Sequence, residues 1–340
     1  FDDFNGQFCN QGKYPLVNAV KNALKGSGGF NPAPVIPTFR PTFRPSPNTP
    51  IFIRPTRPTQ FTNRPIFTQP TIRSSSTTKA INIIDEREFT ERPRPSTSKK
   101  LVVCYHTNWA QYRVGQAKFL PENIDPFLCD MIIYSFAKLE GDRLEPFEWN
   151  DLSTSWSKGM YERTMALKNQ NPNLKILIAV GGWNAGSGPF SSMVKSNVLR
   201  KNFVQNSLKF VRDNKFDGLD LDWEYPGSRE GSSPSDKFLF TQLVMELKNA
   251  YRPFNLLLTA AVGAGYETIS NGYEIDKISK HLDYVNLMSY DLHGSWESFL
   301  GHNAPLYPRR NESPDQAKLN VEWAVNYWLS QGCPKEKLLV

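Results

Sequence analysis

The sequence predicts an α/β fold, a (β/α)8 TIM barrel, for residues 100–340. Short, almost wholly apolar segments alternate there with amphipathic segments, which is typical of a parallel sheet covered by helices. Six complete β/α units and the start of a seventh follow one another, which favours a barrel over a doubly wound sheet. We expect the barrel to be truncated in the seventh strand, with the eighth beyond Val340.

A Pro/Thr/Arg-rich segment, residues 27–99, precedes the predicted barrel. Residues 31–100 hold 13 of the chain's 26 prolines, and proline removes backbone donors and favours extended geometry. Such a composition buries little apolar surface, so it predicts an extended, disordered linker. Its repeated Phe-Arg-Pro units leave open two other roles, a contact surface for an acidic partner or an O-glycosylated stalk.

The formal charge of +7 belongs to this linker. Residues 31–100 carry 12 Lys or Arg against 4 Asp or Glu, a net of +8, so the remainder is near −1. A nearly neutral domain argues against binding to nucleic acid. No run of about 18 apolar residues occurs, and we predict no membrane segment in this chain.

Seven apolar segments are the predicted strands: 101–109, 131–139, 175–183, 218–226, 256–262, 284–292 and 337–340. The amphipathic stretches between them include the predicted helices 189–214, 235–251 and 315–331. Parallel strands place their carboxyl ends at one mouth of a barrel, where such enzymes keep their active sites.

The predicted strand 218–226 carries an alternating series of acidic residues, in FDGLDLDWEYPG (216–227). Asp220, Asp222 and Glu224 share one face of a strand, because successive side chains point to opposite faces. That face would look into the barrel, with the carboxyl groups climbing toward its mouth. Three carboxylates so close cannot all ionise cheaply, so at least one should stay protonated near neutral pH and serve as a general acid.

Two other readings of this series are open from the residues alone. Alternating carboxylates are good ligands for a divalent metal, although the glycine placement of an EF-hand loop is absent. A solvated edge strand with incidental charges is the second, and the flanking Phe216, Leu219 and Leu221 argue against it. No cysteine pair has CxxC spacing, and there are only 4 His, so we predict no metal site.

DGLDLDWEYPG (217–227) is similar to the DxxDxDxE signature of glycoside hydrolase family 18, the chitinases and their relatives. Four further blocks resemble that family in its order: CYHTNWAQYR (104–113), YSFAKL (134–139), GGWN (181–184) and NLMSYDLHGSWE (286–297). The resemblance covers residues 101–340. It implies a TIM barrel that binds chitin or chitin oligosaccharides and needs no cofactor.

The resemblance also implies endo-acting hydrolysis of β-1,4-linked N-acetylglucosamine polymers by a substrate-assisted retaining mechanism. Glu224 would be the general acid, and the substrate's N-acetyl carbonyl would attack the anomeric carbon. Asp222 would orient the acetamido group, and Asp220 would share a proton with Asp222. Tyr290 would hydrogen-bond the acetamido oxygen, with Met288 and Asp291 beside it.

Sugar rings have apolar faces, so aromatic residues usually line a glycan cleft. The resemblance assigns substrate stacking to Tyr105, Trp109, Phe136, Trp183 and Trp296, although a tryptophan in a strand is more often part of the core. We expect the remaining tryptophans to be structural, the last two as helix packing: Trp149, Trp156, Trp323 and Trp328.

Four cysteines suit either a few disulfides in a secreted protein or buried thiols. The resemblance implies a disulfide between Cys104 and Cys129, and Cys333 has no obvious partner. A disulfide predicts an extracellular protein, secreted or surface-anchored. We also expect a monomer.

The opening residues, FDDFNGQFCNQGKYPLVNAVKNAL (1–24), resemble the last strand and final helix of a family 18 domain. We expect residues 1–26 to end an upstream domain, as in the multi-domain chitinases of arthropods. An unrelated helical cap is one alternative. Completion of the same barrel is another, but it would leave most of the seventh strand unsupplied.

Two other activities remain open beside the chitinase. One is a chitin-binding, lectin-like relative with little turnover, although such relatives usually lose the acid that Glu224 supplies here. The other is cleavage of the chitobiose core of N-glycans.

Overall fold

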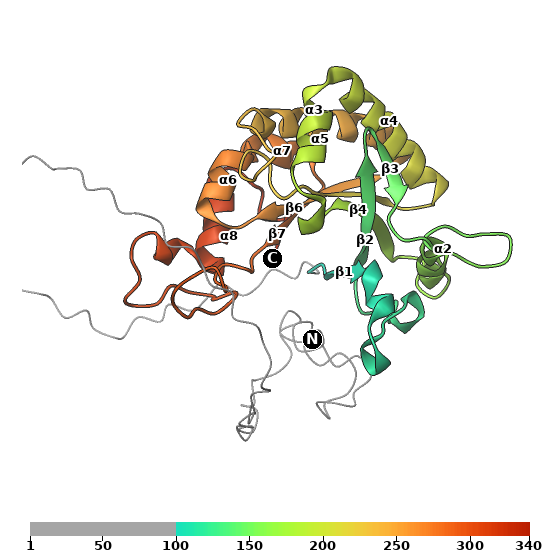
Figure 1. The fold of residues 1–340 in the computed structure, drawn as a ribbon, viewed down its shortest axis with the longest axis horizontal. Helices are drawn as coiled ribbons and strands as arrows, with labels where there is room; N and C mark the ends of the chain where they lie inside the picture. Colours follow the sequence, from blue (N-terminus) through green and yellow to red (C-terminus); the bar gives the residue numbers. More distant parts are fainter. Residues whose placement is uncertain (1–99) are drawn as a thin grey trace, which may run out of the picture. The chain divides into compact units, whose positions relative to one another are not determined.

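The computed structural model describes residues 100–340 (Figure 1). The predicted upstream end (1–26), the predicted linker (27–99) and Cys9 lie outside the described residues.

The described residues form a curled sheet of parallel strands, as predicted. These strands, each paired in parallel with the next, are β1 (Val103–Thr107), β2 (Met131–Glu140), β4 (Lys175–Gly181), β5 (Gly218–Asp222), β6 (Leu257–Gly263), β7 (Tyr284–Met288) and β8 (Leu338–Leu339). The sequence did not predict β3 (Arg143–Pro146), which pairs antiparallel with the end of β2. β8 corresponds to the predicted beginning of the seventh strand.

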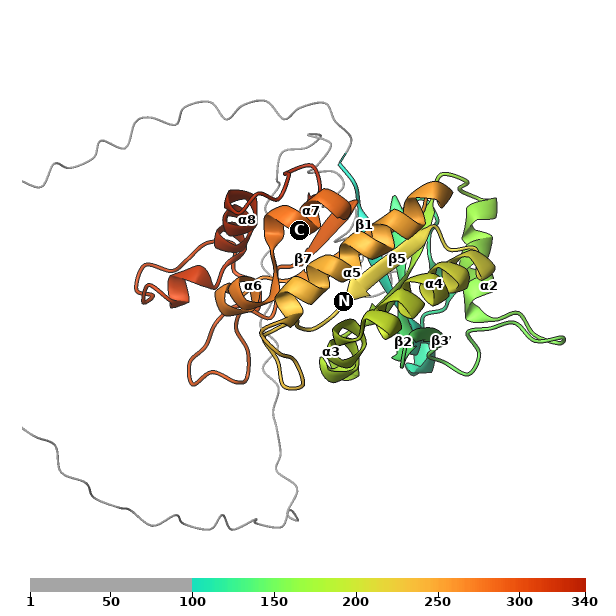
Figure 2. The same cartoon turned by 90° about the horizontal axis from the view of Figure 1, so that it is seen from above.

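The parallel strands from β2 onward are connected through α-helices, whereas 3-10 turns connect β1 to β2. Helices α3, α4 and α5 pack against one another outside the sheet (Figures 1 and 2). The helices are α2 (Met160–Met165), α3 (Gly188–Lys195), α4 (Asn197–Asp213), α5 (Asp236–Tyr251), α6 (Tyr266–Gly272), α7 (Ile275–His281) and α8 (Val321–Ser330). Short 3-10 turns occur at Asn108–Tyr112, Gly115–Ala117, Pro121–Asn123, Ala166–Asn169, Trp183–Ala185, Arg252–Phe254 and Gln316–Lys318.

Two predicted helices begin or divide differently in the structure. The predicted helix 189–214 is two helices, because Ser196 has extended backbone angles and its hydroxyl accepts the Leu199 N–H at 3.3 Å, capping α4. The predicted helix 315–331 begins later, because the Asn320 side chain accepts the Trp323 N–H at 2.9 Å and caps α8.

The main core lies between the sheet and its helices. Trp223, directly after β5 and on the outward face of this segment, is 1% exposed and stacks on Phe190 of α3 with ring centroids 5.3 Å apart. The apolar face of this segment therefore meets the helices, as predicted. A smaller cluster, including Ile133, Leu177 and Ala179, fills the inside of the sheet.

Of the four tryptophans expected to be structural, two are and two are not. Trp328 of α8 is buried, and Trp323 stacks on Tyr327, as predicted. The prediction is wrong for Trp149 and Trp156, which are 84% and 85% exposed. Both lie in the connection between β3 and α2, where a loop runs over the surface instead of packing into the core.

The predicted disulfide joins Cys104 of β1 to Cys129, just before β2, with 6.1 Å between the two Cα atoms. Cys333 is a buried free thiol. Within residues 100–340, no helix has the length and apolar character to cross a lipid bilayer.

Candidate active site

The acidic series follows β5 to the carboxyl edge of the sheet. Asp220 is 0% exposed, Asp222 is 5% exposed and Glu224 is half-buried, so exposure rises along the series. The predicted strand 218–226 is too long, since β5 ends at Asp222. The neighbouring strand β4 ends at Gly181, the partner of Asp222, so Glu224 lies in the connection that follows β5.

Asp220 accepts hydrogen bonds from three strands. The hydroxyls of Thr259 (2.5 Å) and Tyr105 (2.9 Å) and the amide of Asn286 (3.1 Å) all donate to its carboxylate. Burial raises the pKa of Asp220 to about 6, and these three bonds oppose the rise. Sequence reasoning missed Thr259 and Asn286; the available signal is a polar residue within an otherwise apolar strand.

Asp222 lies between the other two carboxyl groups. Burial raises its pKa well above the ordinary value, and the charges of Glu224 and Asp220 raise it further. Its buried Oδ1 has no hydrogen-bond partner among residues 100–340. The proton that Asp220 and Asp222 are expected to share stays a prediction; the Asp220 oxygens accept hydrogen bonds from Thr259, Tyr105 and Asn286. Asp222 therefore ionises less readily than a free aspartic acid, and its Oδ1 is available to a bound ligand.

Glu224 has the properties of a proton donor. Burial raises its pKa, the Tyr225 hydrogen bond and the Arg229 charge lower it, and the Asp291 charge raises it. The net shift is upward, so this carboxyl group keeps its proton to a higher pH than a free glutamic acid. A carboxylic acid in this state, at the open end of a buried series, is suited to general acid catalysis.

Exposed aromatic rings stand at the same edge of the sheet. The predicted rings that are most exposed are Tyr105 (40%), Trp109 (45%), Trp183 (60%) and Trp296 (65%). Trp109 stacks on the partly buried Phe136, with centroids 6.1 Å apart. Trp109, Trp183 and Trp296 follow β1, β4 and β7 respectively, so three separate connections bring apolar ring faces to one edge.

The end of β7 contributes the remaining predicted residues. Met288 is its last residue, and Tyr290 follows, 52% exposed, with a pKa raised to about 12 by burial and by the charges of Asp222 and other carboxylates. Asp291 accepts a hydrogen bond from Asn303 at 2.7 Å. A cavity of about 210 Å³ is lined by Leu101, Val103, Tyr105, Asn286, Leu287, Met288, Tyr290, Leu339 and Val340.

Two glycines let the β4 connection pass close to the acidic series. A Cβ atom on Gly181 would lie 2.0 Å from the Asp222 carbonyl oxygen, and one on Gly182 would lie 2.8 Å from the Phe136 ring. The Gly182 N–H donates to that Asp222 carbonyl at 2.8 Å. Positive φ angles at both positions also favour glycine.

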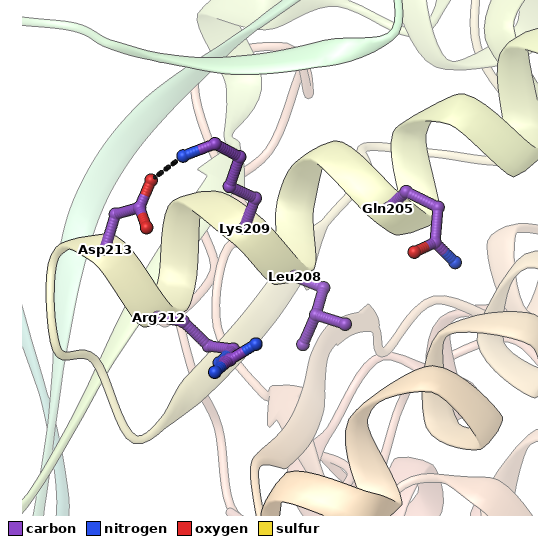
Figure 3. A pocket seen from close by; sticks show the side chains of 5 residues that line it. All are labelled: Gln205, Leu208, Lys209, Arg212 and Asp213. Carbon is purple, nitrogen blue, oxygen red and sulfur yellow. Dashed lines mark hydrogen bonds and ion pairs between the residues drawn. The ribbon is translucent and has the colours of Figure 1, made fainter.

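Other parts of the described surface lack this chemistry. In residues 100–340 no group of three or more His, Cys, Asp or Glu is arranged to hold a metal ion. A second hollow, on the outer surface of α4, is lined by Gln205, Leu208, Lys209, Arg212 and Asp213, with an ion pair between Lys209 and Asp213 (Figure 3). It contains none of the predicted site residues.

Known proteins resemble the described part of this chain. Residues 101–340 match the model of the glycosyl hydrolases family 18. An endochitinase of Brugia malayi is 46% identical over 70% of this chain and 47% of its own length, so the chain spans about half of this relative.

Solved structures give the same picture. The Ostrinia furnacalis group IV chitinase, in complex with allosamidin, is 42% identical, with a TM-score of 0.67 over 71% of this chain and 64% of its own. Human YKL-39, described as a pseudo-chitinase with retained chitooligosaccharide binding, is 39% identical, with a TM-score of 0.64 over 70% and 65% of the two chains. The chain belongs to family 18 of the glycosyl hydrolases.

Proposed function

We propose that this protein is an extracellular, endo-acting chitinase, which hydrolyses β-1,4-linked N-acetylglucosamine polymers with Glu224 as its general acid. The observation that carries the proposal is the acidic series of β5. Two buried carboxyl groups lie beneath a half-buried one whose pKa is raised, at an edge lined by exposed aromatic rings.

The first chemical step transfers the proton of the Glu224 carboxyl group to the glycosidic oxygen. As the bond between this oxygen and the anomeric carbon breaks, the carbonyl oxygen of the substrate's own N-acetyl group bonds to that carbon, forming an oxazolinium ion. Asp222 hydrogen-bonds the acetamido nitrogen through its unpaired Oδ1 and stabilises the cation. Tyr290 donates to the acetamido oxygen, and Asp220 holds the inner end of the series.

The second step restores the acid. The Glu224 carboxylate removes a proton from a water molecule, whose oxygen attacks the anomeric carbon and opens the oxazolinium ring. The configuration at that carbon is retained, since each step inverts it. Exposed rings at Trp109, Trp183 and Trp296 supply stacking surfaces for the sugars on either side of the bond, which suits an extended polymer.

The relatives support the same substrate class. The Ostrinia furnacalis chitinase binds allosamidin, and YKL-39 binds chitooligosaccharides. A monomeric, secreted or surface-anchored protein fits an insoluble extracellular polymer and the Cys104–Cys129 disulfide.

The test is Glu224→Gln in the full-length protein, assayed on soluble chitin oligomers. The substitution removes the proposed proton donor, so we expect turnover to fall at least 10³-fold, an order-of-magnitude figure, with oligomer binding retained. Glu230→Gln, which removes an exposed carboxylate from the same connection, is the matched control and should keep its activity. Unchanged turnover in Glu224→Gln would contradict the proposal.

The similarity to YKL-39 favours a second candidate, a chitin-binding protein with little turnover. Tight binding of oligomers by the wild-type protein, with no new reducing ends released, would support it over the chitinase. Product analysis on chitin and on a glycoprotein separates both from cleavage of N-glycan cores.

A further inference from the structure

Arg229, in the connection after β5, contacts both the acid residue and an aromatic ring of the cleft. Its guanidinium carbon lies 3.7 Å from the centre of the Trp183 ring. Its Nη1 donates to the Trp183 carbonyl at 2.7 Å and to the Glu224 carbonyl at 3.2 Å. The Arg229 side chain therefore connects Trp183, in the connection after β4, to Glu224, in the connection after β5.

The stacked guanidinium leaves the Trp183 ring usable. It covers one face of the indole, and the side chain is still 60% exposed, so the other face stays open to a sugar ring. A planar guanidinium suits this arrangement, because it can stack on a ring and donate hydrogen bonds in its own plane.

The backbone around Arg229 is itself held in place. Its N–H donates to the Ser232 hydroxyl at 3.1 Å, and the Ser232 N–H donates to the Arg229 carbonyl at 2.9 Å. Gly231 packs against Gly188 at the start of α3, where an added Cβ would lie 2.9 Å from the Gly188 nitrogen. The connection that carries Arg229 is thus built against the connection that carries Trp183.

We propose that Arg229 is a positioning residue, which couples the sugar-stacking ring of Trp183 to the proton donor Glu224 so that a polymer bound on the ring presents its glycosidic oxygen to the acid. The inference rests on the proposed function. It assigns a role to a residue outside the acidic series. A sequence motif does not show this role, because Arg229 acts through hydrogen bonds to the backbone carbonyls of Trp183 and Glu224.

The charge of Arg229 affects the pH dependence of activity, which can be measured separately from substrate binding. Glu224 is faced by Asp222 of β5, by Tyr290 and Asp291 after β7, and by Tyr225 and Tyr273, and Arg229 is the cation that lowers its pKa. Loss of this positive charge raises the pKa of Glu224 and moves the alkaline limb of the pH profile of kcat/KM to higher pH, because the acid must be protonated to act.

Two substitutions in the full-length protein separate geometry from charge. Arg229→Lys keeps the charge but loses the planar contact, so we expect KM for chitin oligomers to rise about fivefold with the alkaline limb unmoved. Arg229→Met keeps an apolar contact with the ring but removes the charge, so the alkaline limb should move upward. Arg212→Ala is the matched control, because Arg212 makes a similar contact with Phe254 (4.2 Å) on the outer surface of α4, and both readouts should stay unchanged.

The outcomes distinguish this inference from the proposed function. A wild-type protein without turnover would refute the chitinase, and binding of oligomers, followed by tryptophan fluorescence, would still test whether Arg229→Lys weakens the complex about fivefold. Wild-type values of KM and binding in Arg229→Lys, or an unmoved alkaline limb in Arg229→Met, would overturn the inference for Arg229.

Discussion

At the scale of single residues, Asp220 is the most constrained group of the site. Its carboxylate is fully buried, yet three donors from β1, β6 and β7 surround it. Burial outweighs these bonds, since its pKa is raised from 3.8 to about 6. A carboxyl group that ionises less readily in the folded protein than in the unfolded chain makes folding depend on pH.

The sign of this dependence follows from the two pKa values. Between about pH 4 and pH 6 the folded state binds more protons at Asp220 than the unfolded state does, so its contribution to stability falls as pH rises, by about 3 kcal/mol in total. We expect Asp220→Asn to lack this component. Urea unfolding of both proteins from pH 3.5 to pH 7.5 checks it: the difference in unfolding free energy should change across this window and level off above it. A constant difference would contradict the assignment.

The sequence predicts those site residues that recur at a regular spacing along the chain. Asp220, Asp222 and Glu224 are two positions apart, so the alternation of a strand predicts their common face. Thr259, Asn286 and Arg229 could not be placed in this way. Their partners lie 39, 66 and 46 positions away in sequence, and only the pairing of strands and connections brings them together.

At the scale of elements, the connections after β4 and β5 behave as one unit. Ser187 lies just before α3 and is fully buried. Its hydroxyl accepts the indole N–H of Trp223 and donates to the Tyr225 carbonyl at 3.0 Å. Ser187 and Arg229 therefore hold two consecutive backbone carbonyl groups, those of Tyr225 and Glu224.

Ser187→Ala should destabilise the fold by about 1–3 kcal/mol, because it leaves a buried donor and a buried acceptor without their partner. Ser191→Ala, within α3, is the matched control, since the buried Ser191 hydroxyl has no hydrogen-bond partner among the described residues. Its removal should cost less than about 0.5 kcal/mol. Chemical denaturation of both variants measures the contrast, and equal losses would show that the Ser187 bridge contributes nothing.

The predictability of the elements followed their apolar pattern. The strands were predicted because buried parallel strands are nearly continuous apolar runs, but residues such as Glu224 and Tyr290 were placed in strands that end earlier. β3 was not predicted, because its sequence, RLEP, is short and has no continuous apolar run. Trp149 and Trp156 were predicted to be structural because of their residue type alone. No periodic apolar pattern surrounds them, so the sequence does not show whether their side chains face the core or the solvent.

At the scale of the whole described domain, one edge of the sheet carries the candidate active site and the other carries hydrogen bonds that stabilise the fold. The carboxyl edge carries the acidic series and the exposed rings. At the other edge, an aspartate stands directly before β2, β5 and β7: Asp130, Asp217 and Asp283. Each donates its backbone N–H to the carbonyl of a residue on, or directly before, the preceding parallel strand, and its carboxylate accepts that residue's N–H. The pairs are Asp130 with Val102, Asp217 with Ile176 and Asp283 with Leu258. We call this reciprocal pair of hydrogen bonds a bracket. It fixes where β2, β5 and β7 begin, at the edge of the sheet opposite the acidic series.

The Asp283 bracket allows stability to be separated from activity. Its carboxylate also pairs with Lys248 of α5 at 2.6 Å, and the Lys248 side chain is only 16% exposed. Asp283→Ala therefore leaves a mostly buried ammonium group and the Leu258 N–H without this partner, and should cost about 2–3 kcal/mol. Lys248→Met removes the ammonium but keeps the backbone bracket, and should cost about 1 kcal/mol or less.

Neither substitution at this edge touches a group that contacts substrate. We therefore expect kcat/KM on chitin oligomers at 25 °C to stay within about twofold of wild type for both variants, while the midpoint of urea unfolding falls more for Asp283→Ala than for Lys248→Met. Glu224→Gln should show the opposite behaviour, with turnover lost and the midpoint kept. A large loss of kcat/KM in folded Asp283→Ala would mean that the strand starts transmit their register to the carboxyl edge, and the separation of the two edges would be wrong.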